Sequence, residues 1–154
     1  MKKVILVAAL VLGVATAAIA QPRAVGLRMG YGAEASYQHN IGKANFIEAD
    51  LGLGILGQRD SSSTASLNVA ATYNWMLAQP QWTDRGEWGF YAGAGAALGI
   101  SNTINIGVAG QIGLEYTFWF PLQLSVDIRP QLGLVGGSFG IWGWYPNLSA
   151  RYRF

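Results

Sequence analysis

The sequence contains no cysteine, a single histidine and few charged residues, and each shortage excludes a class of site. Without cysteine there are no disulfides, no thiolate metal ligands, no cysteine nucleophile and no lipid-bearing N-terminal cysteine. His39 alone leaves no imidazole cluster for zinc and at most one imidazole as a general base. Only 12% of the 154 residues are charged, about half the ~25% of soluble domains, which argues against an ordinary water-soluble globule.

The small net charge is concentrated at the start of the chain. Lys2 and Lys3 account for the whole formal charge of +2, because the other basic residues equal the acidic residues in number. A neutral chain with charges of mixed sign has no electrostatic footprint for nucleic acid. No nucleic-acid partner is therefore predicted.

The first 20 residues have the pattern of a cleavable secretory signal. Lys2-Lys3 precede the apolar run Val4–Val14, and the small residues that follow end in Ala18-Ile19-Ala20, an A-x-A cleavage pattern. An uncleaved membrane anchor is the alternative, because the apolar stretch reaches the lower limit of a spanning helix. No basic stop-transfer cluster follows, so we expect cleavage before Gln21 and a domain of residues 21–154 outside the cytoplasm.

From Val25 onward the sequence alternates in twos, which is the period of a β-strand. Apolar residues such as Leu27 and Met29 share one phase, and small or polar residues share the other. The charges within the alternating runs all fall on the second phase: Arg28, Glu34, Glu48, Asp50, Glu115, Asp127, Arg129, Arg151 and Arg153. The two faces of the sheet are thus expected to meet different surroundings.

The composition of the polar phase indicates which face is outside. It consists of glycine, alanine, serine and amide residues with a few charges, which makes a poor solvated surface but a suitable filling for a narrow barrel. The apolar phase would then face lipid, as in outer-membrane barrels. The sequence therefore predicts an all-β fold, an eight-stranded antiparallel up-and-down transmembrane β-barrel after a cleaved signal peptide.

Eight strands are obtained by dividing one of seven alternating runs. The run from Val25 to His39 is long, and Gly30-Tyr31-Gly32 within it has turn chemistry. The predicted strands cover residues 24–30, 33–39, 45–56, 65–77, 87–99, 105–118, 121–134 and 147–154. Loops are expected near 57–64, 100–104 and 135–146, and the segment 78–86 is long for a turn at the opposite rim. That rim is expected to be periplasmic and to carry an aromatic girdle of Tyr37, Phe46, Tyr73, Trp75, Trp88, Phe90, Phe118, Trp119, Phe120, Tyr152 and Phe154.

The charged residues are expected to pair inside the barrel rather than to form a catalytic acid–base set. Asp127 with Arg151 is the preferred pair, because the last two strands are neighbours. A barrel filled in this way leaves no channel of porin width. In the loop near 135–146, Trp142, Trp144 and Tyr145 are candidates for a surface contact, with an upper aromatic girdle as the alternative.

The end of the chain carries a family resemblance. The signal-like start, the alternation and the terminal Arg151-Tyr152-Arg153-Phe154 resemble small bacterial outer-membrane β-barrel proteins, eight-stranded and OmpA/OmpX-like. The stretches Gly113–Tyr116 and Phe120–Pro130 are similar to a two-strand hairpin of Bacteroides-type members. The resemblance implies an integral outer-membrane location in a Gram-negative bacterium. It also implies that the insertion machinery reads the last strand, with the signal residues Leu148, Ala150, Tyr152 and Phe154.

Three motifs that suggest chemistry have plainer explanations. Gly52–Gly57 matches a dinucleotide fingerprint by its letters, but no helical pattern follows it, so no cofactor is predicted. Asn147-Leu148-Ser149 matches a glycosylation acceptor by chance. Ser36 and His39 are the only neighbouring nucleophile and base for a membrane lipid hydrolase, yet they point to opposite faces of an extended strand.

These patterns together predict a small, monomeric, non-enzymatic barrel with a plugged polar interior. It is expected to act structurally, or through its outer loops on an unknown surface ligand, with outer-membrane lipid and the insertion machinery as partners. Two alternatives stay open, namely a narrow conductor of solutes or ions and, more remotely, an outer-membrane lipid-modifying enzyme.

Overall fold

The computed structural model describes residues 22–30, 32–42, 44–53 and 66–154. The predicted signal segment 1–20 and the predicted loop 57–64 lie outside these ranges. No helix within them is long and apolar enough to cross a membrane. The strands are β1 (Pro22–Met29), β2 (Ala33–Ile41), β3 (Asn45–Leu53), β4 (Leu67–Ala78), β5 (Glu87–Ile100), β6 (Ile104–Thr117), β7 (Leu122–Ile128), β8 (Gln131–Val135), β9 (Ser138–Trp142) and β10 (Pro146–Arg153).

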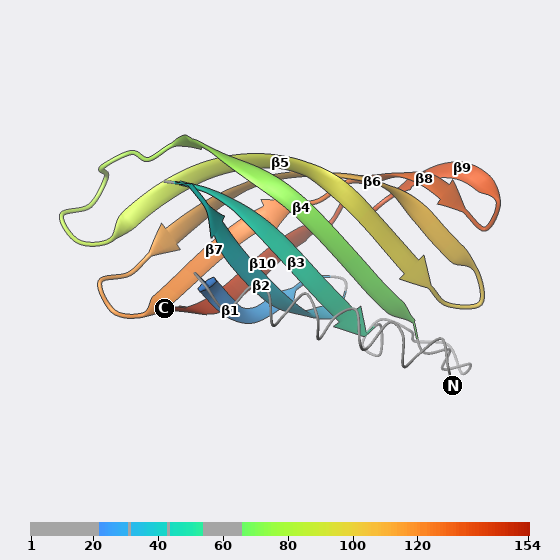
Figure 1. The fold of residues 1–154 in the computed structure, drawn as a ribbon, viewed down its shortest axis with the longest axis horizontal. Helices are drawn as coiled ribbons and strands as arrows, with labels where there is room; N and C mark the ends of the chain where they lie inside the picture. Colours follow the sequence, from blue (N-terminus) through green and yellow to red (C-terminus); the bar gives the residue numbers. More distant parts are fainter. Residues whose placement is uncertain (1–21, 31, 43, 54–65) are drawn as a thin grey trace.

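The strands close into an antiparallel barrel (Figure 1). The order β5-β4-β3-β2-β1-β10-β7-β6 returns to β5, because β5 also pairs with β6. The predicted all-β, eight-stranded antiparallel barrel is thereby confirmed. Following registered partners from Leu27 in the two directions reaches β5 at Leu98 and at Trp88, ten residues apart. A shear of this size over eight strands corresponds to strands tilted by about 40°.

One barrel strand is divided into β7 and β8 by a proline. Ile128 faces Ile112 on β6, and Gln131 faces Ala109, so both halves follow the same register on that strand. The interruption falls at Pro130, which has no N–H to donate to the ladder. The predicted strand 121–134 is thus a single strand with one missing hydrogen bond.

A second barrel strand is divided into β9 and β10 by a bulge. Ile128 faces Pro146 and Gln131 faces Trp142, so four steps along one strand oppose three along its neighbour. One residue is therefore extra, and Gly143 supplies the positive φ of 76° that such a bulge favours.

The predicted loop at 135–146 is wrong, because most of it is a β-hairpin. β8 and β9 meet at Gly136-Gly137, where both residues have positive φ, as a tight two-residue hairpin turn requires. Phe139 and Ile141 then continue the outward apolar phase and are exposed. The hairpin extends one wall of the barrel beyond β1 and β2 (Figure 1). We call this end, which also holds the β5–β6 turn at 101–103, the mouth.

The other strand predictions agree closely with the observed bounds. The division at Gly30–Gly32 is confirmed, since the Gly30 N–H donates to the Gly32 carbonyl at 3.0 Å between β1 and β2. The long connection at 78–86 is also present, with no regular structure between β4 and β5 after Ala78. Residues 54–56 and 65 of two predicted strands lie outside the described ranges.

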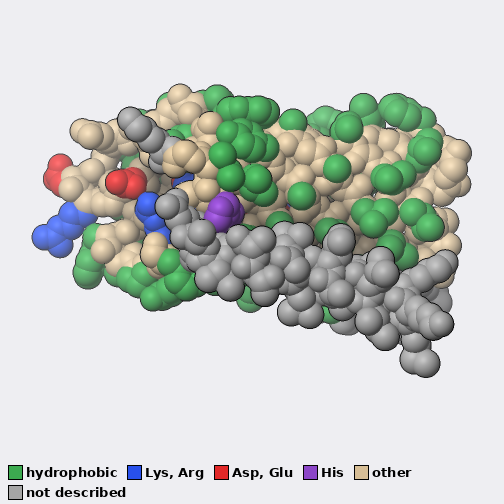
Figure 2. Space-filling view, in the orientation of Figure 1, with side chains coloured by type: hydrophobic (Ala, Val, Ile, Leu, Met, Phe, Trp, Pro, Cys, Tyr) green, Lys and Arg blue, Asp and Glu red, His purple; other side chains and the backbone are tan. Residues whose placement is uncertain are grey.

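The interior of the barrel is polar and its outer wall is apolar. Among the described residues, 17 buried side chains are polar or charged and only six are hydrophobic, whereas 30 large hydrophobic side chains are exposed. Figure 2 shows one face of the wall, where hydrophobic side chains spread over the strands and the visible charges gather at the end where β10 finishes. The alternation therefore separates two faces in the sense opposite to a soluble sandwich, whose core is apolar.

Aromatic rings line the outside at the end of the barrel opposite the mouth. Trp88, Tyr116 and Phe118 form a continuous series, with ring centroids 4.7 and 4.6 Å apart. Phe46 does not belong to this girdle, which corrects the prediction. It is fully buried inside the barrel, where its ring meets Tyr91 edge-on at 5.2 Å. Phe46 shares the polar phase of β3, and phase, not height along the barrel, decides which way a strand residue points.

Candidate functional site

The middle of the barrel is filled by a hydrogen-bonded group around Arg151 and Glu48. Arg151 on β10 lies 3.0 Å from a carboxylate oxygen of Glu48 on β3, and both side chains are 0% exposed. Arg151 also donates to the Ser36 and Ser125 hydroxyls at 2.9 and 2.7 Å. Glu48 accepts further hydrogen bonds from Gln38 and Gln111, at 2.7 and 2.9 Å. Strands on opposite sides of the barrel are thus joined through its centre.

A second ionic group lies closer to the mouth. Arg28 pairs with Asp127, and Arg129 pairs with Asp50. The two arginines share one oxygen of Glu34, at 2.8 and 2.7 Å respectively. Glu34 is the least buried of the five, with 18% of its side chain exposed, so this carboxylate lies at the boundary between the ionic interior and the mouth.

A third group lies toward the opposite end. The guanidinium of Arg23 pairs with Glu115 and stands over the Phe46 ring, 4.1 Å from its centroid. Gln123 donates to the other Glu115 oxygen at 2.8 Å. The three groups together fill the barrel along its axis with charges that are paired and hydrogen-bonded, the arrangement that buried charges require.

The predicted network differs from the observed one in the partner of Asp127 and in the position of Arg153. Asp127 pairs with Arg28, not with Arg151, because Asp127 faces Asn147 in the register of β7 on β10 and Arg151 faces Gln123. Arg153 lies at the rim with its side chain 36% exposed, and its partner Glu87, 3.5 Å away, is more exposed still.

Arg23 is a network residue that the alternation misses. It precedes the predicted strand 24–30 and has the same phase as Val25, so regular alternation would turn it outward. A bulge between Pro22 and Ala24 inserts one residue into β1 and turns Arg23 inward. The Pro22-Arg23 pair, ahead of an otherwise regular run, is a weak sequence signal for that bulge, since proline is tolerated at strand ends and bulges.

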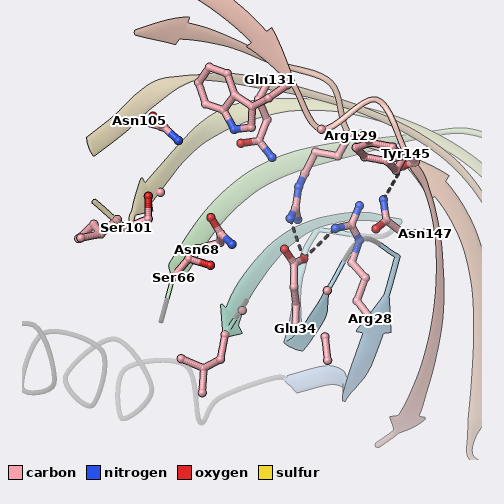
Figure 3. Close-up of a pocket in the computed structure, with 18 of the residues that line it drawn as sticks. Arg28, Glu34, Ser66, Asn68, Ser101, Asn105, Arg129, Gln131, Tyr145 and Asn147 are labelled. Atoms are coloured by element: carbon pink, nitrogen blue, oxygen red, sulfur yellow. Dashed lines mark hydrogen bonds and ion pairs between the residues drawn. The ribbon is translucent and has the colours of Figure 1, made fainter. Parts of the chain in front are cut away.

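Above the second ionic group, the mouth encloses a cavity of about 440 Å³ (Figure 3). Arg28, Glu34 and Arg129 form its floor. Uncharged polar side chains and two rings line its walls, contributed by four stretches of chain: Ser66 and Asn68; Ser101, Asn102 and Asn105; Gln131 and Trp142; Tyr145 and Asn147. A smaller cavity of about 60 Å³ lies at the opposite end beside Arg23 and Glu115.

The three aromatic residues predicted as a loop contact take two different positions. Trp142 ends β9 and lines the mouth cavity. Tyr145 also lines it, although half of its surface is exposed. Trp144 is exposed and is not among the cavity residues. The bulge at Gly143 separates these directions.

The residues predicted to carry the insertion signal lie on the outer face of β10. Leu148, Ala150 and Tyr152 alternate with the buried Ser149 and Arg151, and all three are exposed. Phe154 follows the strand and meets Tyr152 edge-on at 5.3 Å. β10 pairs with β1 on one side and with β7 on the other, and so closes the barrel.

Ser36 and His39 lie on opposite faces of β2. Ser36 is buried inside the barrel and accepts a hydrogen bond from Arg151. His39 lies on the outer face beside Tyr37, whose hydroxyl is 3.3 Å from Nδ1. These two residues therefore do not form a nucleophile–base pair. Within the described ranges, no three histidine, aspartate or glutamate residues are grouped so as to hold a metal ion.

Comparison of the chain with protein-family models, curated proteins and solved structures gives no match.

Proposed function

We propose that this chain is a small, monomeric, integral outer-membrane β-barrel protein whose interior is plugged by ion pairs. In this proposal it has no enzymatic activity, and acts structurally or through the loops at its mouth. Residues 1–20 serve as a cleaved signal peptide. Outer-membrane lipid surrounds the wall, and the insertion machinery reads the last strand.

One observation supports the proposal above all others, the inverted distribution of polar and apolar side chains. The buried positions hold arginine, glutamate, aspartate and amide side chains, and the outer wall carries isoleucine, leucine and valine. Soluble monomers rarely expose an apolar patch that continues around the whole molecule, as these side chains do. Lipid is the solvent in which such a surface is stable. The aromatic series outside the end opposite the mouth agrees with an interfacial girdle.

The first experiment is fractionation of the cell envelope, followed by a denaturing gel of boiled and unboiled samples. The proposal expects the protein in the outer-membrane fraction and a different mobility for the unboiled band. A soluble periplasmic protein without a mobility shift contradicts it.

Two arginine substitutions on one strand test the contact with lipid more sharply. Ile112 in the middle of β6 and Ile104 at its mouth end both point outward and are 54% and 63% exposed. In a bilayer, Ile112→Arg is expected to lower the free energy of unfolding by about 2–4 kcal/mol and Ile104→Arg by about 0–1 kcal/mol. The measurement is urea unfolding in lipid vesicles. Equal effects at the two positions contradict a membrane-spanning wall, because in water both isoleucines are simply exposed.

The ionic filling leads to an expectation for conduction as well. Because three paired groups occupy the barrel along its axis, the intact protein is expected to give no discrete current steps in a planar bilayer. Reproducible steps contradict a plugged interior and favour the narrow conductor instead.

A further inference from the structure

The mouth cavity is a built concave site rather than a gap between loops. Its volume of about 440 Å³ falls in the range of small-molecule sites, about 300–1,000 Å³. Its floor is rigid, because Arg28 and Arg129 are each held by two carboxylates, with Glu34 in common. Its walls come from strands on both sides of the barrel.

The charge of the floor selects against charged ligands. Arg28 and Arg129 pair with Glu34 at the floor and, outside the cavity lining, with Asp127 and Asp50, so the group holds three carboxylates for two guanidinium groups. An anion would meet arginines that are already paired, in a group whose net charge is negative. A metal cation would meet in Glu34 an oxygen that already accepts from both arginines. An uncharged ligand is the one that this floor accommodates.

The walls offer amides and rings, which suit a polyhydroxylated ligand. Figure 3 shows the side chains of Asn68, Asn105 and Gln131 directed into the space above Glu34. Asn105 lines this wall, and its side-chain oxygen Oδ1 has no hydrogen-bond partner in the protein. An unpaired amide oxygen is stabilised when a hydroxyl donates to it. Trp142 adds an apolar face at the same wall. A pyranose ring has an apolar C–H face and a rim of hydroxyls, which complement a ring and amides respectively.

We infer that the mouth cavity binds one unit of an uncharged saccharide, with Asn105 and Gln131 as hydrogen-bonding groups and Trp142 as the stacking surface. The inference deepens the proposed function and rests on it in one respect, that the mouth opens to the outside of the cell. The saccharide comes either as a free solute or as the end of a surface glycan.

The test is an NMR titration of the purified, full-length barrel in lipid nanodiscs, which avoids detergents with sugar headgroups. The probes are maltotriose and chitobiose as neutral saccharides, and inorganic phosphate and a sulfated disaccharide as anions. Saturable binding of a neutral probe with a Kd below about 10 mM is expected, and weaker or no binding of the anions. No saturable binding of either neutral probe, or tighter binding of an anion, overturns the inference. A further measurement identifies the source of the saccharide. If the barrel in nanodiscs binds vesicles with smooth lipopolysaccharide, which carries long glycan chains, but not vesicles with rough lipopolysaccharide, which lacks them, the ligand is the end of a surface glycan.

Matched variants assign the binding to the cavity. Trp142→Ala is expected to weaken binding about tenfold or more, whereas Trp144→Ala, two residues away and outside the cavity, leaves it unchanged. Asn105→Leu keeps the size of the side chain and removes its polar atoms, and about a tenfold loss is expected. The unboiled gel mobility confirms that each variant is folded. Equal affinity of the two tryptophan variants and unchanged binding by Asn105→Leu together overturn the assignment.

The envelope fractionation and the saccharide titration together separate this inference from the proposed function. A membrane-embedded barrel that binds no neutral saccharide refutes the cavity ligand and leaves the barrel proposal standing. A soluble barrel that binds the saccharide refutes the membrane proposal and leaves the cavity assignment standing.

Discussion

Arg151 and Arg153 lie two residues apart on β10, yet one belongs to the centre of the barrel and the other to its rim. Arg151 is enclosed with Glu48 and two serine hydroxyls, whereas Arg153 and Glu87 are exposed and 3.5 Å apart. The same residue type on the same strand thus has two roles. In the centre, a charge is held by many partners and water has no access. At the rim, solvent competes for it.

The difference shows which charges make a wrong pairing of strands costly. An exposed pair contributes about 0–1 kcal/mol, since water and salt screen it. A buried pair contributes little net stability compared with an apolar replacement, but removing one partner strands the other charge. A wrong strand register would therefore be costly in the interior, where it leaves a buried charge unpaired, and nearly neutral at the rim.

The largest effect is expected from breaking the central group. Arg151→Met leaves the buried Glu48 carboxylate without its counter-charge and is expected to cost about 3–5 kcal/mol of unfolding free energy. The measurement is urea unfolding in lipid vesicles. The double variant Arg151→Met/Glu48→Gln removes both charges and should recover most of the loss.

The rim provides the control for that experiment. Arg153→Met removes an exposed partner of Glu87 and is expected to change the unfolding free energy by less than about 1 kcal/mol. Similar losses for Arg151→Met and Arg153→Met would show that the centre of the barrel is as accessible to water as its rim.

Two glycines, one inside the barrel and one in a turn, differ in the space that surrounds them. A Cβ at Gly113 would lie 2.4 Å from the Tyr91 ring, and that ring is fully buried against Phe46 and has no room to swing. Gly113→Ala is expected to cost about 1–3 kcal/mol, as overpacking of an interior does. Gly32 in the β1–β2 turn has open space around it, so Gly32→Ala should stay within about 0.5 kcal/mol. Urea midpoints of the two variants check this, and a neutral Gly113→Ala would mean that the ring moves.

The smallest effect is expected from salt. Raising NaCl to about 1 M shortens the Debye length to about 3 Å and screens the rim pair, while the enclosed centre is little affected. The unfolding free energies of the wild type and Arg153→Met should therefore converge within a few tenths of a kcal/mol. A large salt-induced loss in the wild type would place water around the interior ion pairs.

The sequence pattern was sufficient for the faces of the strands and for most of their bounds. Alternation identified Arg28, Glu48 and Arg151 as residues of the polar phase, and all three are buried. The length of the run and the turn chemistry of Gly30–Gly32 located the β1–β2 turn. The success with the faces has a simple physical basis, because side chains in an extended strand point alternately to the two faces whatever the strand pairs with.

The errors at Arg23, at Trp142 and Trp144, and in the partner of Asp127 arise where one extra residue changes the phase or where register decides the partner. The bulge at Arg23 turns that side chain inward, and the bulge at Gly143 gives Trp142 and Trp144 different surroundings. The choice of Arg28 for Asp127 follows from the shear of the barrel, which depends on the offsets of all eight strands. Neither a bulge nor the register between strands produces a periodic pattern in the sequence.

The pairing of β1 with β10 has a consequence for the order of folding. The hairpins along the chain join residues close in sequence, whereas the pairing of β1 with β10 sets Ala24 opposite Arg153 and Met29 opposite Leu148. Loop-closure entropy makes this contact slow to form, and until it forms both strands have free edges. We therefore expect the last event of assembly to be the meeting of the two most distant parts of the described chain, with the edges of β1 and β10 open until that step.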